Sequence, residues 1–176
     1  MNRVFYKELD THPDEADCCT WKDEPFTGVA YSTHEDGSIS SEWTFQDGEQ
    51  WGPRRTWLPN GQLGETHYCL GGMAHGVRRW WRPNGCKLAV EFYRFGVLLR
   101  SRTWDEDGRV ERDYRVEDEE EPQWYLTQAE RHRKEVEAYG RGVDLPEEYT
   151  LLADADWNDP PTPHDAPTIR SAQTDG

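Results

Sequence analysis

The chain has 176 residues, of which 34% are hydrophobic, and a formal net charge of −15. Residues 25–116 hold 12 basic and 12 acidic residues, so the acidic excess lies in the flanking residues 1–24 and 117–176. Binding to nucleic acid or to an anionic membrane needs a basic surface, and we expect neither kind of partner.

Residues 1–24 form an acidic lead-in to the rest of the chain. The apolar run Val4-Phe5-Tyr6 predicts a short strand that protects one edge of a sheet. The first residues lack the basic and apolar regions of a secretory signal, and no apolar run is long enough to span a bilayer. We therefore expect a cytoplasmic protein.

The cysteines show no pattern of a disulfide framework or a metal site. There are four, none at CxxC spacing, and two of them are adjacent: Cys18, Cys19, Cys69 and Cys86. Adjacent cysteines do not easily bridge to each other, so we expect free thiols.

Glycines recur at one interval in residues 25–116. Three sets have a spacing of 24 residues: Gly28, Gly52 and Gly76; Gly37, Gly61 and Gly85; Gly48, Gly72 and Gly96. A fixed period of this size indicates one small structural unit that is repeated along the chain.

Each repeat has the sequence of a β-hairpin. An Asx-Gly dipeptide, which favours a type I′ turn, separates two strand-like segments. The dipeptides are Asp36-Gly37, Asn60-Gly61, Asn84-Gly85 and Asp107-Gly108. The predicted strands are 29–34 and 39–45, 53–58 and 63–69, 77–82 and 88–95, and 98–104 and 110–116.

These hairpins predict a mainly β fold. Connections this short leave no room for crossover helices, so we expect an elongated antiparallel meander of stacked hairpins and no parallel pairing. Nine Trp and eight Tyr residues suit a single curved layer, because large aromatics cover a sheet face with few residues.

Residues 117–176 predict a helix and an acidic tail. After an acidic linker, residues 117–123, Thr127 and Glu130 have capping-box spacing, and Gly140 supplies a stop. We expect a helix over residues 128–139, within a capping region 124–141, that docks through Ala129, His132, Val136 and Tyr139. It should cover the exposed edge of the last hairpin. In the tail, 142–176, residues 145–152 should pack as a short segment, and disorder is expected from Asn158 onward.

The repeats resemble a known family. The residues that carry the resemblance are 24–31 (EPFTGVAY), Asp36-Gly37, 52–63 (GPRRTWLPNGQL) and 74–85 (AHGVRRWWRPNG). They are similar to the MORN-variant repeats of the YwqK-family antitoxin proteins. The resemblance implies a row of β-hairpins and membership of a bacterial toxin–antitoxin or immunity system. The fourth unit departs from the pattern, because Arg100 stands where a glycine would fall.

One triplet recurs at the same place in three units. Its residues are Arg55 and Trp57, Arg79 and Trp81, and Arg102 and Trp104. Residues two apart on a strand share a face, so these side chains should form a stripe across the sheet. The stripe is a candidate binding surface, because Arg and Trp are enriched among interface anchors. Alternatively, Trp fills the packed face of the sheet and Arg caps it.

The sequence contains no supported metal, cofactor or catalytic site. His34, His67 and His75 lack further ligands at a supporting spacing, and no glycine-rich phosphate loop opens a helix. Cys69 and His67 lack a third, orienting group. We therefore expect neither a cofactor nor a metal.

Two functions remain open at this point. The first is a non-enzymatic antitoxin or immunity protein that binds a protein partner, with a basic toxin as the expected class because of the acidic flanks. The alternative is an enzyme or an accessory factor of a small biosynthetic pathway on a MORN-like scaffold, which predicts an aromatic-lined cavity with converging titratable groups. A lipid-facing scaffold is a third option, and the charge of −15 argues against it.

Overall fold

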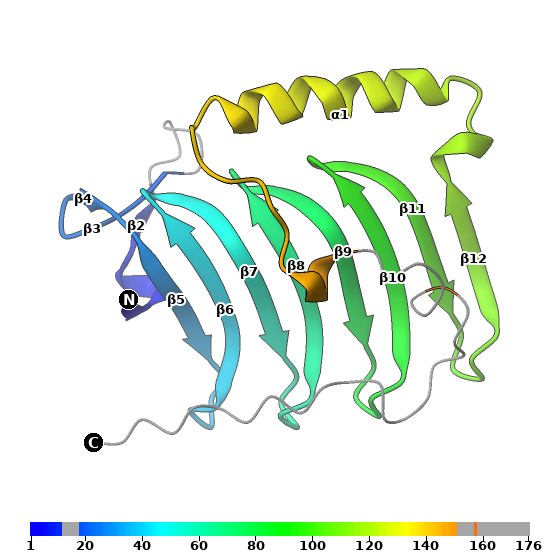
Figure 1. The fold of residues 1–176 in the computed structure, drawn as a ribbon. Coiled ribbons are helices and arrows are strands. Elements are labelled where there is room, and N and C mark those ends of the chain that lie inside the picture. Colours follow the sequence, from blue (N-terminus) through cyan, green and yellow to red (C-terminus); the bar gives the residue numbers. More distant parts are fainter. Residues whose placement is uncertain (12–17, 151–156, 158–176) are drawn as a thin grey trace.

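A computed structural model describes residues 1–11, 18–150 and 157 (Figure 1). Its main element is a nine-stranded sheet in the order β1-β5-β6-β7-β8-β9-β10-β11-β12, next to a small sheet of β2, β3 and β4. The strands of the main sheet are β1 (Asn2–Phe5), β5 (Gly28–Thr33), β6 (Ile39–Gln46), β7 (Glu49–Trp57), β8 (Leu63–Leu70), β9 (Met73–Trp81), β10 (Lys87–Arg94), β11 (Val97–Trp104) and β12 (Val110–Arg115). The small sheet consists of β2 (Asp10–Thr11), β3 (Cys19–Trp21) and β4 (Glu24–Pro25).

The predicted meander is confirmed for β5 to β12. Each of these strands pairs antiparallel with the next one in the sequence. The expectation of no parallel pairing is wrong at the N-terminal edge, where β1 lies parallel to β5, with Asn2 opposite Gly28. The 3-10 helix η1 (Tyr6–Glu8) and the small sheet lie between these two strands in the sequence and make the connection long enough for a parallel return.

The turns at the Asx-Gly dipeptides are not of type I′. Only the glycine of each pair has positive φ, as at Gly37 (85°), and the preceding Asx does not. Asp36 instead accepts a hydrogen bond from the backbone N–H of Ser38 (2.9 Å), and Asn60 accepts one from Gln62 (3.1 Å). This local bond favours a type I turn followed by a left-handed glycine.

Turns of the I′ type lie at the opposite ends of the strands. Both central residues have positive φ in Asp47-Gly48, Gly71-Gly72 and Phe95-Gly96. These turns join one repeat to the next. Their second position is glycine in all three cases, because glycine adopts positive φ without strain.

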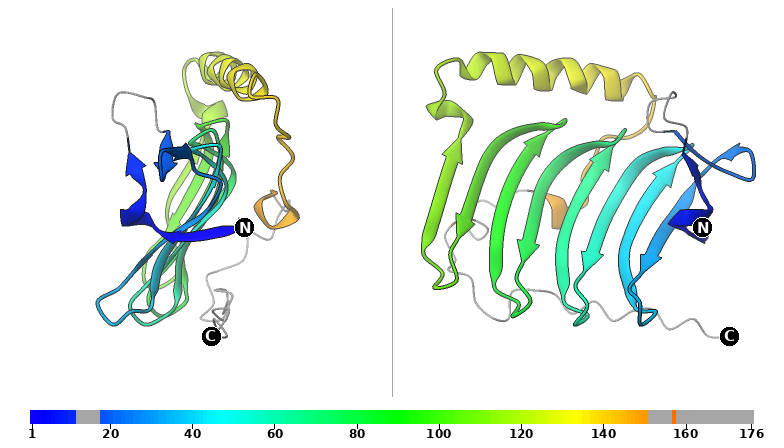
Figure 2. Two further views of the ribbon diagram at one scale, coloured as in Figure 1. Left: turned by 90° about the vertical axis from the view of Figure 1, so that its left-hand side faces the viewer. Right: turned by 180° about the vertical axis from the view of Figure 1, so that it is seen from behind.

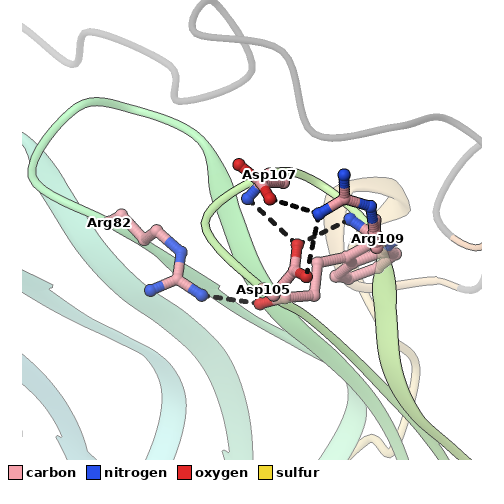
Figure 3. Close-up of polar contacts among 5 residues, drawn as sticks. Arg82, Asp105, Asp107 and Arg109 are labelled. Atoms are coloured by element: carbon pink, nitrogen blue, oxygen red, sulfur yellow. Dashed lines mark hydrogen bonds and ion pairs between the residues drawn. The ribbon is translucent and has the colours of Figure 1, made fainter.

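Near the Asx-Gly turns, side chains of one hairpin form hydrogen bonds with backbone carbonyls of the next hairpin. The Nε2 atom of His34 lies 3.0 Å from the carbonyl oxygen of Trp57, and Asn60 donates to the carbonyl of Pro83 (2.8 Å). In the last pair of tips, Arg82 donates to the carbonyl of Trp104 (2.6 Å), beside the Asp105 turn (Figure 3). These contacts fix the stagger of successive repeats.

The helix α1 (Pro122–Glu137) starts earlier than expected. Proline suits the first turn of a helix, because backbone N–H groups there have no acceptor within the helix and the absence of one costs no hydrogen bond. Thr127 lies inside the helix and donates to the carbonyl of Gln123 (2.7 Å), so the predicted capping box is wrong. Gly140 follows the helix with φ of 67°, as a stop residue should.

The helix crosses the ends of the strands instead of covering the sheet edge (Figure 1). Val136 is fully buried in a cluster with Trp51, Leu70 and Phe95, close to the I′ turns. The helix also contacts β11, which confirms the predicted docking against the last hairpin, but the predicted cover of the exposed sheet edge is wrong. β12 stays at the edge of the sheet, and the apolar residues near the turns provide the surface on which the helix packs.

The N-terminal elements η1 and β2–β4 lie on one side of the main sheet, and the 3-10 helix η3 (Glu147–Tyr149) lies on the other (Figure 2, left). The N-terminal elements cover β5 and β6 through a cluster that includes Val4, Phe26 and Phe45. The position of η3 confirms a packed segment within 145–150. A further short helix, η2 (Val116–Asp118), links β12 to α1.

Two other expectations concern cysteines and the tail. All four cysteines are free thiols, as predicted. No helix of the described residues is both long and apolar enough to cross a membrane. The disorder expected from Asn158 onward, and residues 151–152 of the packed segment, lie outside the described residues.

Candidate functional site

One row of residues runs straight across the middle of the sheet. Register partners place Arg55 of β7 opposite Thr66, Thr66 opposite Arg79, Arg79 opposite Val90, and Val90 opposite Arg102 of β11. Residues directly opposite each other on paired strands project to the same face. We call Arg55, Arg79 and Arg102 the arginine row, and the face that carries them the tail face.

The 3-10 helix η3 and Trp157 lie on the tail face, with η3 in front of β8 and β9 in Figure 1. Arg55 Nη2 lies 3.1 Å from the Glu148 carboxylate, and Arg79 donates to the Glu148 carbonyl oxygen (2.8 Å). Arg102 donates to the carbonyl oxygen of Trp157 and also pairs with Asp113. Each arginine of the row thus binds a group of the same C-terminal region.

Tyr149 is one of two aromatic anchors of this region. It is 1% exposed, its hydroxyl lies 3.1 Å from the Thr66 hydroxyl, and its ring centroid lies 5.2 Å from that of Tyr68. Burial raises the pKa of Tyr149, so the phenol stays neutral. A Cβ atom on Gly76 would lie 2.4 Å from the Tyr149 carbonyl oxygen, so this repeat glycine allows the close approach.

Trp157 is the second anchor. It is 2% exposed and packs in a cluster with Val77, Val90 and Trp104. The guanidinium carbon of Arg100 lies 4.0 Å from its ring centroid, within the range of a cation–π contact. Arg100, which breaks the glycine pattern of the fourth unit, therefore has a contact of its own.

The six residues predicted as binding residues lie on the tail face, where the arginines make polar contacts and the tryptophans are buried to different extents. The arginines contact Glu148 and Trp157, as described above. Trp81 and Trp104 are 5% and 2% exposed, and Trp57 is partly buried. The sequence interpretation did not identify Glu148, Tyr149 and Trp157 as the contacts of the row; the apolar positions between 145 and 152 were the available signal.

The opposite face, which we call the open face, carries a compact polar cluster. Glu65 Oε1 accepts from Arg78 Nε (2.7 Å) and lies 3.0 Å from His67 Nδ1. Burial disfavours the charge of Glu65, but His67 and Arg78 outweigh it and lower the pKa of this carboxyl. Arg78 stacks on Trp80 at 4.1 Å, and Arg54 on Trp43 at 5.2 Å.

The open face also holds the residues considered for nucleophilic catalysis. Glu65, His67 and Cys69 alternate along β8, so Glu65 supplies the orienting group that the sequence interpretation did not identify. Cys69 is 3% exposed, however, and burial raises the pKa of its thiol to about 11. A nucleophilic cysteine needs an accessible thiolate, and this site does not provide one.

Two of the three histidines considered as metal ligands bind the backbone, and the third, His67, contacts Glu65. His75 Nδ1 accepts from the N–H of Phe95 (3.0 Å), and His34 contacts the carbonyl of Trp57. Burial lowers the pKa of His75 to about 4, which keeps the ring neutral and able to accept. Within the part of the chain that the structure describes, no three His, Cys, Asp or Glu residues are grouped to hold a metal ion.

Comparison with known proteins does not add a relative to this description. No protein-family model matches the chain, and no curated protein matches it either. The similarity of the repeats to MORN-variant repeats remains a prediction from their residues.

Proposed function

We propose that the chain is a repeat protein that binds another protein directly, and that it acts as an antitoxin or immunity protein that neutralises a toxin. One observation carries the proposal: equivalent arginines of three successive hairpins each bind a group of the C-terminal region. A surface with this arrangement suits a polypeptide, because its three arginines bind two main-chain carbonyl oxygens and a carboxylate.

The repeat sets the spacing of these contacts. Equivalent positions of successive hairpins are two strands apart, about 10 Å. Guanidinium groups suit such a surface because they present several donors in a fixed plane and bind carboxylates and carbonyls well. Trp57 beside them is only partly buried and offers aromatic area, the kind of anchor that dominates interface energies, whereas Trp81 and Trp104 are already buried within the chain.

The acidic flanks support a basic partner. Glu117 and Asp118 are exposed, and a hollow at the start of α1 is lined by Glu119, Glu120, Glu121, Trp124 and Tyr125. Trp124 is 55% exposed there. A basic toxin would be attracted to this region by charge, which speeds encounter, while the arginine row makes the specific contacts.

The test is co-expression of the chain with the product of the adjacent gene. We expect the two proteins to co-purify and the chain to relieve any growth arrest that the neighbour causes. The paired substitution Arg55→Gln with Arg79→Gln should weaken the complex at least tenfold by titration calorimetry. Its matched control, Arg54→Gln with Arg78→Gln, changes the adjacent residues on the open face and should leave affinity within about twofold.

Two results would contradict the proposal. The first is repeated recovery of the chain as a lone monomer with no effect on growth. The second is a complex that survives the tail-face pair but is lost with the open-face pair, which would place the partner on the other side of the sheet.

A further inference from the structure

We propose that Glu148, Tyr149 and Trp157 are a built-in ligand of the tail face, and that this face exchanges them for an extended acidic and aromatic segment of a partner protein. The inference rests on the proposed function, since it names the part of the partner that is bound and the step that must precede binding. It is carried by four features of the tail face.

The contacts are those of peptide recognition. Arg79 and Arg102 bind main-chain carbonyl oxygens, which every polypeptide carries. Arg55 binds a carboxylate, and the two anchors fill separate places, Tyr149 against Tyr68 and Trp157 among Val77, Val90 and Trp104. The surface therefore specifies an acidic residue followed by an aromatic one, with a second aromatic residue further along.

The sheet does not need this segment for its own hydrogen bonds. Strands β7 to β11 are paired on both sides by their neighbours, and η3 adds no strand to the sheet. Because η3 is held through side chains and through arginine donors, it can leave without breaking the strand ladder. A segment that was part of the ladder would break backbone hydrogen bonds of the sheet when it left.

The ionic contact is weak enough to exchange. The side chain of Glu148 is 61% exposed and that of Arg55 is 27% exposed, so water screens the pair. The hold on the segment therefore depends mainly on the two buried rings. A tethered ligand of this kind keeps a high effective concentration, and a partner must outcompete it.

Departure of the segment would expose apolar side chains that Trp157 now helps to cover. Val77 and Val90 are fully buried, and Trp104 is 2% exposed, while the arginines of the row stand between them. An exposed surface of apolar and cationic side chains gains from an occupant that covers both. This local chemistry is independent of the overall charge of the partner, so a basic protein can supply the segment.

The experiment uses the full chain and a fluorescein-labelled peptide with the sequence of residues 143–157. The double variant Tyr149→Ala with Trp157→Ala removes the built-in anchors. Fluorescence anisotropy should show this variant binding the peptide at least tenfold more tightly than the unsubstituted chain, in which the built-in anchors compete. A peptide with both aromatic residues replaced by Ala should bind at least tenfold more weakly.

Substitution of two adjacent arginines, one on each face of the sheet, shows which face binds the peptide. Arg79→Gln, added to the double variant, should weaken peptide binding at least fivefold, whereas Arg78→Gln should change it less than twofold. Equal affinity of the double variant and the unsubstituted chain, or equal effects of the two arginine substitutions, would overturn the inference.

If the double variant does not fold, a second measurement tests the inference on the unsubstituted chain. The unsubstituted chain is then titrated with unlabelled peptide to millimolar concentration while its amide NMR signals are recorded. Shifts at Arg55, Thr66 and Arg79 are expected, and their absence would overturn the inference. Failed peptide binding with an intact toxin complex would reject this inference alone, and peptide binding without any toxin complex would reject the proposed function alone.

Discussion

The two faces of the sheet carry adjacent arginines of the same strands, and these arginines have different partners. Arg54 and Arg78 of the open face contact Trp43, Trp80 and Glu65, all within the sheet. Arg55 and Arg79 of the tail face contact Glu148, far away in the sequence. Arginines that are paired within the sheet need no partner from another segment, whereas a row of arginines alternating with Thr66 and Val90 leaves donors for one.

The largest expected difference between the faces is in buried aromatic area. Trp104→Ala should lower the free energy of unfolding by about 3–5 kcal/mol, because the ring lies in the cluster with Val77, Val90 and Trp157. Trp80→Ala on the open face should cost about 1–2 kcal/mol, since its ring is only partly buried. Urea unfolding measures both values, and equal losses would show that the faces are packed alike.

A second comparison uses two glycines of the repeat. Gly37→Ala should cost about 1–2 kcal/mol, because φ is positive but no atom lies within 4 Å of the new Cβ. Gly76→Ala adds a clash with the Tyr149 carbonyl oxygen and should cost about 2–4 kcal/mol. Thermal unfolding gives the difference, and hydrogen exchange should increase around residues 147–150 in the Gly76 variant alone.

The third comparison concerns one histidine from each face and the effect of pH. His75 has a folded pKa of about 4, against an ordinary value of 6.5, because burial disfavours the charged ring. The unfolded chain therefore takes up the proton first, and stability should fall as pH drops from about 6.5 to 4 and then level off. The loss should be about 2 kcal/mol, allowing for partial exposure.

His75→Gln keeps an acceptor for the Phe95 N–H but removes the titration, so its stability should vary less over this pH range. His67→Gln on the open face should flatten the profile less, because the nearby Glu65 opposes the effect of burial on the pKa of His67. Chemical unfolding at a series of pH values tests this, and parallel profiles of His75→Gln and the unsubstituted chain would contradict it.

The smallest expected effects come from the carboxylates. Glu65→Gln should destabilise by about 1–2 kcal/mol, because Glu65 is nearly buried at 12% side-chain exposure and holds Arg78. Glu148→Gln should cost less than about 0.5 kcal/mol, since its pair with Arg55 is solvent-exposed. A larger loss for Glu148→Gln, measured by urea unfolding, would mean that the ion pair and not the aromatic anchors holds η3.

The eight strands of the meander were predictable, because the sequence pattern that indicates each strand lies within or directly beside it. Glycines at a fixed period mark both rows of turns, and the strands lie between them. The turn type was not predictable from the dipeptide alone, since the Asp36 side chain binds the backbone N–H of Ser38 and favours negative φ. The helix begins at Pro122, earlier than predicted, because proline is favoured in the first turn of a helix. Thr127 therefore lies inside the helix and not at its N-terminal cap.

The occupant of the candidate site was not predictable for a different reason. Arg55 and Glu148 are 93 residues apart, and no periodicity relates the repeats to the tail. The position of α1 was not predicted either, because its docking surface includes Leu70, which precedes one turn, and Phe95, which lies in another turn 25 residues further along the chain.

The helix that crosses the strand ends also limits how many repeats this fold accommodates. Its 16 residues span about 24 Å, and the five spacings from β7 to β12 also add up to about 24 Å. Beyond its last turn, Tyr139 meets Trp51 and Arg141 pairs with Asp47 at the β6–β7 turn. One more hairpin would widen this distance by about 10 Å, so the chain can gain a repeat only if the helix lengthens by about two turns.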